Sequence, residues 1–420
     1  MAAERSGAML PARDQGVVFL ISGAHGITHW IYISVIILLP EIRTEFSLDY
    51  TWVGTFISVF YVFTALTNIV AGPIGDMTGR RVLLQGLALF FISVGAFLLS
   101  ISVNYWMAWG AAILIAMSTH LWHPGAIPYL TTRYENSRGY VMSIHSLLAN
   151  IGDSVGPFLT GLLVSGAILG YSFGWTWRDV AMMLSVPGLL ILPFIIYFVG
   201  IRGAPEARKR DAGMDLRSYV SGVMTQFKDR VVLGIAVITG LRSAAQGGIR
   251  NFLPFYVVDV MGLDLAYGGF LLMIMSLGGT VAAVPAGLAS DRYGRRRIAM
   301  LALSFTIASV ILLTFIRSET ALVFMVAVLG LSMFGLRPVM MSWMMDVMPP
   351  KFRGSGTNFM FTVQSGCSAV MPLVAGIIAD AYGLAAVFYV IAGVFLVANC
   401  LVYLLPDDKA PNDPADKVGV

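Results

Sequence analysis

The chain has 420 residues, of which 57% are hydrophobic and only 12% are charged, and its formal net charge is +4. Soluble domains carry about twice this share of charged residues, so a soluble fold of this length is excluded and much of the chain must face lipid. Only two cysteines are present, so a disulfide framework and a thiolate metal site are both unsupported. The sequence shows no basic patch with interleaved aromatic residues, so we expect no nucleic-acid partner.

Apolar segments of membrane-spanning length recur twelve times in chain order. The first six are expected at 17–40, 51–72, 82–102, 106–130, 140–170 and 178–200. After a polar stretch, the other six are expected at 231–258, 266–290, 298–316, 321–348, 355–382 and 384–405. The sequence therefore predicts an all-α membrane protein with twelve transmembrane helices.

The positively charged residues predict how these helices are oriented. Most of the 27 lysines and arginines fall in the first segment, the even-numbered loops, the polar stretch and the tail. The opposite loops hold only Arg43, Arg178 and Arg317. By the positive-inside rule, we expect both termini in the cytoplasm of a multi-pass protein of a bacterial-type cytoplasmic (inner) membrane. The expected parts are a cytoplasmic segment 1–16, a six-helix bundle 17–200, a cytoplasmic linker 201–230, a second six-helix bundle 231–405 and a disordered cytoplasmic tail 406–420.

The two halves carry an internal repeat at an offset of about 215 residues. The loop "GPIGDMTGRRV" after the second span matches "AGLASDRYGRRRI" after the eighth. The same offset pairs Asp49 with Asp264 and Pro157 with Pro372. Two six-helix repeats around a central cavity are the plan of one large class of secondary transporters, which place the substrate at the membrane midplane.

The motifs "GDMTGRRV" and "SDRYGRRR" resemble the loop signature of the major facilitator superfamily, and the resemblance covers essentially all twelve spans. Patches such as "HPGA", "RGYVMSIHSLLANIGDSVGP" and "LRSAAQGGIRNFLP" are similar to the fosmidomycin-resistance type of efflux protein. The resemblance implies a conformational gate, in which acidic and basic residues make charge-assisted contacts between helix ends. The gate residues are Asp76, Gly79, Arg80, Asp291, Gly294 and Arg295.

Ionisable residues inside the predicted spans are the most informative feature, because hydrocarbon tolerates them only for a reason. His25 and His29 are four residues apart, and His120 and His123 are three apart, so each pair shares a helix face. Imidazole gains or loses a proton near neutral pH. Asp153 is a second candidate for carrying a proton. For His145, a plain hydrogen bond to a neighbouring helix is an equally good interpretation.

All five histidines lie in the first half, and the second half carries arginines within its spans. Arg242, Arg250 and Arg337 lie within predicted spans. A guanidinium stays charged and offers a planar fork to carboxylate or phosphonate oxygens. The superfamily resemblance implies that spans 1, 4, 7 and 10 line the cavity. We therefore expect His25, His29, His120, His123, Asp153, Arg242, Arg250 and Arg337 to bind substrate or to couple protons.

Together these features predict a secondary transporter that exports a small anionic or amphiphilic organic solute in exchange for protons. The expected partners are the solute, protons and membrane lipids, the expected state is a monomer, and the proton gradient replaces any cofactor or resident metal. No phosphate-binding loop, nucleophile elbow or cofactor fingerprint indicates an enzyme. Three alternatives stay open: uptake of an organic anion, a divalent metal-ion carrier that uses the histidines, and a non-transporting membrane receptor.

Overall fold

A computed structural model describes residues 10–168, 171–172, 174–202, 229–348 and 353–405, without the side chains of 72–73, 76–78, 167–168, 171–172 and 353–358. The expected tail, nearly all of the expected linker and most of the expected N-terminal segment lie outside these residues.

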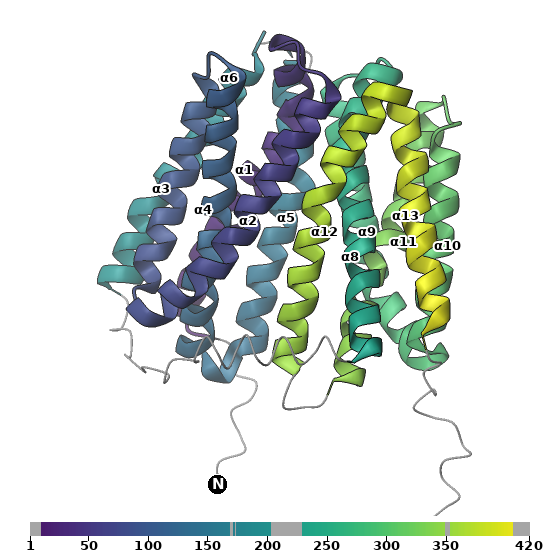
Figure 1. Ribbon diagram of the computed structural model, residues 1–420. Coiled ribbons are helices and arrows are strands. Elements are labelled where there is room, and N and C mark those ends of the chain that lie inside the picture. Colours follow the sequence, from purple (N-terminus) through teal and green to yellow (C-terminus); the bar gives the residue numbers. More distant parts are fainter. Residues whose placement is uncertain (1–9, 169–170, 173, 203–228, 349–352, 406–420) are drawn as a thin grey trace, which may run out of the picture. The chain divides into compact units, whose positions relative to one another are not determined.

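Twelve long helices make up the described residues, which confirms the all-α fold (Figure 1). The first half holds α1 (Ala12–Glu45), α2 (Tyr50–Thr78), α3 (Arg81–Ser100), α4 (Tyr105–Arg133), α5 (Arg138–Ser165) and α6 (Trp177–Phe194). The second half holds α8 (Arg230–Phe255), α9 (Leu265–Tyr293), α10 (Arg295–Leu313), α11 (Glu319–Val347), α12 (Arg353–Tyr382) and α13 (Leu384–Leu404). A short turn η1 (Glu135–Ser137) precedes α5, and π-helical segments η2 (Ile195–Ile201) and η3 (Tyr256–Val260) extend α6 and α8.

Eleven helices of the described chain are long and apolar enough to cross a membrane by length and composition. The exception among the twelve is α4, which carries two histidines and two prolines that lower its hydropathy. Many large apolar side chains are exposed on the helix surfaces, among them Leu190, Val281, Phe305 and Phe324. A hydrocarbon environment explains this exposure, since lipid tails solvate such side chains as well as a protein core does.

One predicted span, 140–170, is wrong at its end. The helix α5 stops at Ser165, because Gly166 adopts a left-handed conformation with φ 67°. Glycine at this position is a common helix stop. Two short antiparallel strands follow, β1 (Ala167–Ile168) and β2 (Tyr171–Ser172), so the apolar run continues beyond the helix.

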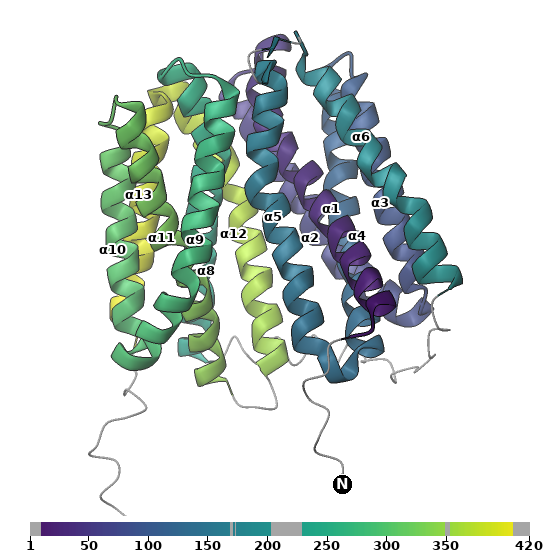
Figure 2. The ribbon, with the colours of Figure 1, turned by 180° about the vertical axis from the view of Figure 1, so that it is seen from behind.

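The chain divides into two compact units. Unit 1 comprises residues 1–47, 59–213 and 264–269, and unit 2 comprises 48–58, 214–263 and 270–420. Within unit 1, α1 packs mainly against α5, and α3 packs against α4 and α6 (Figure 2). Within unit 2, α8 packs against α12 and α13, and α10 packs against α11 and α13.

The repeat predicted from the sequence has a physical role at helix starts. Asp49 accepts a hydrogen bond from the backbone N–H of Trp52 at 2.8 Å, and Asp264 accepts one from Tyr267 at 2.8 Å. Both carboxylates therefore satisfy the otherwise unpaired N–H groups at the start of α2 and of α9.

The repeated prolines mark two close helix contacts. In unit 1 a Cβ atom at Gly269 would overlap the carbonyl oxygen of Pro157, and in unit 2 a Cβ at Gly54 would overlap that of Pro372. Each unit therefore contains the same glycine-mediated contact, built from residues at the repeat offset.

Candidate functional site

Three helices of unit 1 gather all five histidines. His25 and His29 lie on α1, His120 and His123 on α4, and His145 on α5. The side chains of His25 and His145 are buried, and the other three are half-buried. Because α1 and α5 pack closely, their imidazoles reach one another without any intervening side chain.

Two glycines bring α1 and α5 close enough for this arrangement. A Cβ atom at Gly26 would lie 2.6 Å from the carbonyl oxygen of Leu148, and one at Gly152 would overlap the carbonyl oxygen of Gly26. Small residues at a helix crossing let two backbones touch. The sequence thus fixes the helix separation one residue away from His25.

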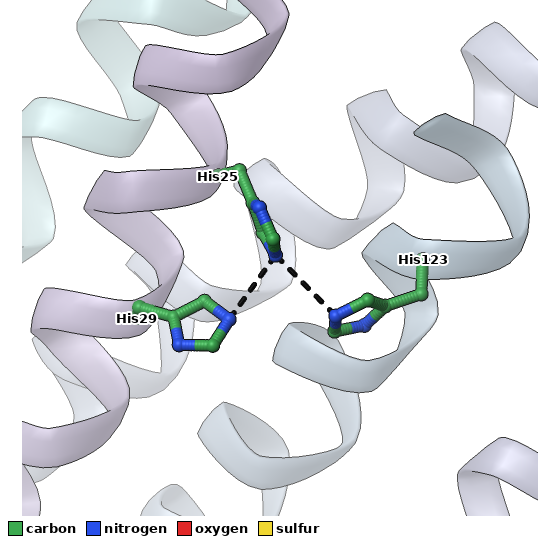
Figure 3. A group of neighbouring side chains, drawn as sticks. All are labelled: His25, His29 and His123. Carbon is green, nitrogen blue, oxygen red and sulfur yellow. Dashed lines mark hydrogen bonds between the residues drawn. The ribbon is translucent and has the colours of Figure 1, made fainter. Parts of the chain in front are cut away.

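His25 is the centre of the cluster (Figure 3). Its Nε2 lies 3.1 Å from Nε2 of His29 and 3.3 Å from Nε2 of His123. Its Nδ1 lies 3.2 Å from the backbone carbonyl oxygen of His145. Its ring also stacks on the ring of His145, with the centroids 4.0 Å apart. Three ring nitrogens from two helices therefore converge on one point.

The contacts of His25 fix its tautomer. A carbonyl oxygen only accepts hydrogen bonds, so Nδ1 of His25 must carry the hydrogen, and Nε2 of the neutral ring is then an acceptor. The Nε2 atoms of His29 and His123 both face this acceptor. At least one of them must donate for the contact to be favourable, so one imidazole N–H points at another imidazole nitrogen.

An acidic residue completes the cluster. Nδ1 of His29 lies 3.1 Å from Oδ2 of Asp153 on α5, an ion-pair distance. The N–H direction is not aligned on that oxygen, so the pair is electrostatic rather than a well-formed hydrogen bond. The two side chains are 21% and 29% exposed, so the pair is only partly buried.

The remaining ring contacts extend the cluster. The ring of His120 stacks near that of His123, with centroids 5.7 Å apart, and meets Tyr32 edge-on at 5.9 Å. Nδ1 of His123 and both ring nitrogens of His145 are buried without a hydrogen-bond partner in the described part of the chain. Buried polar atoms of this kind are costly unless a ligand or solvent satisfies them.

The spacing of the ring nitrogens suits two kinds of bound species, a proton or a divalent metal ion. One nitrogen each from His25, His29 and His123 lies within 4.8 Å of the others, a spacing that a shared proton or a divalent ion could bridge. Asp153 is the acidic residue paired with the cluster. His145, for which the sequence left a simple structural hydrogen bond equally open, belongs to the cluster through its ring and its carbonyl oxygen.

Unit 2 places its charged residues differently. Arg242 on α8 is buried, and its Nη1 donates to Oε1 of Gln246 at 2.7 Å and to the carbonyl oxygen of Met333 at 3.4 Å. Arg250 is half-buried and Arg337 on α11 is exposed. Gln246 was not among the predicted site residues, although its spacing of four residues from Arg242 on one helix was the available signal.

The predicted gate motifs contain two glycines with an unusual backbone. Gly79 has φ 63° and Gly294 has φ 94°. No atom lies within 4 Å of a Cβ placed at either position, so close helix packing does not require these glycines. Glycine is favoured there because the backbone has a positive φ. Arg80 is exposed, and the side chain of Asp76 lies outside the part of the chain that the structure describes.

The second gate motif forms an ion-pair network at the end of α9. Arg295 pairs with Asp291 in the same motif, and its Nε donates to Oδ2 of Asp346 on α11 at 3.0 Å. The network ties three helix ends of unit 2 together, which is the kind of contact that the resemblance implied.

The duplicated six-helix sequence, the membrane-spanning helices and the buried ionisable clusters define a membrane transporter of the two-repeat type. The family model of the Major Facilitator Superfamily matches residues 18–284 and 268–419. The chain belongs to the Major Facilitator Superfamily, whose members carry small molecules, and it is a multi-pass membrane transporter rather than an enzyme.

Named relatives and solved structures agree with this assignment. The chain is 23% identical over 349 residues to the multidrug resistance protein MdtG of Klebsiella pneumoniae, a match that covers 82% of this chain and 81% of the relative. It is 25% identical over 350 residues to MdtG of Escherichia coli, covering 82% of each.

The fold is similar to a bacterial homologue of the human lysosomal transporter Spinster in an inward-facing and occupied conformation. The TM-score is 0.79 at 13% identity, covering 94% of this chain and 97% of the other. A mutant of the nucleoside transporter NupG gives a TM-score of 0.77 at 12% identity, covering 93% and 99%. At these identities the likeness concerns the fold alone.

Proposed function

We propose that the protein exports a small anionic or amphiphilic organic solute in exchange for protons, by alternating access. It acts as a monomer in the cytoplasmic membrane, with both termini in the cytoplasm. The proton gradient is its energy source, and it needs no cofactor. The residues proposed to couple protons lie in unit 1, and the residues proposed to bind the anion lie in unit 2.

One observation carries the proposal: the imidazoles of His25, His29 and His123 face one another inside a membrane helix bundle, with Asp153 behind His29. A buried cluster with one acceptor nitrogen at its centre gains a favourable hydrogen bond when a neighbour is protonated. The Asp153 carboxylate then stabilises the imidazolium of His29. Proton binding therefore changes the charge of the cluster without a large rearrangement, as a coupling site requires.

The choice of solute and direction has separate support. Arg242, Arg250 and Arg337 give unit 2 fixed positive charge within its helices, which favours an anionic group. Export follows the relatives, which are named as multidrug resistance proteins. The sequence "GDSVGPFLTG" in α5 is a partial match to the motif of superfamily antiporters and favours the same direction.

Transport into inside-out membrane vesicles tests the proposal. Vesicles with an acidic interior should accumulate the solute, because protons leaving the lumen drive export from the original cytoplasmic face. The panel should contain a phosphonate, a carboxylate, a cationic dye and Zn²⁺. Asp153→Asn should abolish the response to the pH gradient, while Glu135→Gln should keep it, because Glu135 pairs with Arg138 at an exposed helix end away from the cluster.

Each other outcome would favour a different function. Accumulation driven by an alkaline interior would indicate solute–proton symport, and therefore uptake in the cell. Transport of Zn²⁺ alone would indicate a metal carrier. Equal transport by the wild type and Asp153→Asn at every pH gradient would contradict the role of the imidazole cluster.

A further inference from the structure

Among the described residues of unit 2, Arg242 carries a buried positive charge that no carboxylate neutralises. This side chain is only 3% exposed, and its Nε is buried without a hydrogen-bond partner in the described residues. Its two bonds go to neutral oxygens, those of Gln246 and of the Met333 backbone. In the part of the chain that the structure describes, no carboxylate forms an ion pair with it.

A second positive charge adds to this imbalance. Arg337 lies on α11 one helical turn beyond Met333, whose carbonyl oxygen accepts from Arg242. A buried charge without a partner of opposite sign is unfavourable unless a ligand compensates it. Arg242 is the buried charge that needs such compensation, and the exposed Arg337 adds positive charge on the neighbouring helix.

Gln246 forms a hydrogen-bonded pair with Arg242. A guanidinium only donates hydrogen bonds, so the amide oxygen of Gln246 must face Arg242 and its NH₂ group must point the other way. Gln246 is half-buried, whereas Arg242, one helical turn before it, is buried. The amide donor of Gln246 is therefore the more accessible part of the pair.

We propose that Arg242 and Gln246 form an oxyanion subsite on α8, which binds a carboxylate or phosphonate-type group. This subsite deepens the proposed function, and it rests on that function for the statement that the anionic group belongs to the exported solute. Gln246 determines whether the charge of Arg242 is neutralised within the protein. Its neutral amide holds the guanidinium in place and leaves the positive charge available to the ligand. A carboxylate at the same position would satisfy Arg242 internally and exclude an anion.

Gln246→Glu tests the subsite, because the two side chains have nearly the same shape. The full-length protein in detergent is titrated with methylphosphonate, inorganic phosphate, acetate and chloride by calorimetry. The wild type should bind the oxyanions more tightly than chloride. Gln246→Glu should weaken oxyanion binding by roughly ten-fold or more, the size of a lost charge-assisted hydrogen bond. Its unfolding temperature should equal or exceed that of the wild type, because Arg242 gains an ion pair.

Two further variants separate this role from a structural one. Gln246→Ala keeps the positive charge and loses the amide donor, so its binding should fall between the wild type and Gln246→Glu. Gln15→Glu makes the same chemical change at the start of α1, where the amide bonds the carbonyl oxygen of Leu10, and should bind oxyanions as the wild type does. A structural role for Gln246 predicts the reverse order, with alanine the more damaging substitution.

The outcomes distinguish the subsite from the proposed function. The titration uses no pH gradient, so a failure of proton coupling leaves its result unchanged. Equal oxyanion binding by the wild type and Gln246→Glu, or no preference of the wild type for oxyanions over chloride, would overturn the subsite. Tighter binding of methylphosphonate than of phosphate would assign the subsite to a solute headgroup, and the reverse preference would assign it to free phosphate.

Discussion

Replacing Gly26 by alanine tests whether the crossing of α1 and α5 builds the histidine cluster. The new Cβ would lie 2.6 Å from the carbonyl oxygen of Leu148, whereas ordinary contacts begin at 3.4 Å. The helices must therefore separate by roughly 0.8 Å, enough to lose a quarter to a half of the contact energy at the crossing. Overpacking of this kind costs about 1–3 kcal/mol.

Gly23 on the same helix provides a matched control. No atom lies within 4 Å of a Cβ placed there, so Gly23→Ala adds no clash. Alanine is favoured over glycine inside a helix by about 1 kcal/mol, and both variants receive this gain. Gly23→Ala should therefore be more stable than the wild type, and it should exceed Gly26→Ala by about 1–3 kcal/mol in unfolding free energy.

Two measurements check this expectation. Unfolding of the purified protein in detergent gives the order of stability. NMR of histidine-labelled protein reports the ring environments, and the signals of His25 and His145 should move in Gly26→Ala but stay in place in Gly23→Ala. Equal stability of the two variants, or unchanged histidine signals in Gly26→Ala, would refute the view that glycine at this crossing sets the geometry of the site.

Three other substitutions have defined expectations. In Asp153→Asn, the NMR signals of the His29 ring should move, because the charged oxygen 3.1 Å from its Nδ1 becomes part of a neutral amide; unchanged His29 signals would contradict the pairing. Thr160→Val removes the acceptor that lies 3.0 Å from the indole nitrogen of Trp30 and should lower the unfolding free energy by about 1–3 kcal/mol, measured by denaturant titration; a loss near zero would mean that the indole finds another partner. Arg295→Gln should cost about 1 kcal/mol or less, because its carboxylate partners are exposed, and the difference from the wild type should shrink as salt is added.

The fold was predictable because lipid imposes a simple rule on sequence. A run of apolar residues in a membrane must become a helix, since no water can satisfy its backbone. The predicted starts of α2 and α9 are accordingly within a residue of the observed ones, and the repeated aspartates cap both helices. The end of α5 was not predictable in the same way, because Gly166 stops the helix by its backbone conformation while the apolar composition continues.

The sequence was enough to predict which residues belong to the candidate site. It was not enough to predict which of them contact one another. Spacing on one helix indicates that His25 and His29 share a face, but it carries no information about which helix that face meets. The meeting depends on Gly26 and Gly152, whose role is visible only once the two backbones are placed. Gln246 was not predicted for a related reason. A neutral amide in a span does not indicate a site by itself, and its role follows only from the hydrogen bond that its oxygen accepts from the buried guanidinium.

The two units carry different chemistry at matched positions. At offsets of 214 and 215 residues, His29 and Asp153 of unit 1 correspond to Ser243 and Ser368 of unit 2, whose hydroxyl oxygens lie 3.2 Å apart. The same two positions thus hold a titratable ion pair in one unit and a neutral hydrogen bond in the other.

A further pair of matched residues, on α4 and α11, also differs between the two units. "HP" in α4 corresponds to "RP" in α11, so the imidazole of His123 is matched by the guanidinium of Arg337. Imidazole changes its charge near neutral pH, and guanidinium does not. In the proposed exchange of an anion for protons, the imidazoles of unit 1 would take part in proton coupling, and the guanidinium of unit 2 would supply a constant positive charge for the anion. Because the two properties lie on different repeats, a change of charge in one unit would leave the charge of the other unit unaltered.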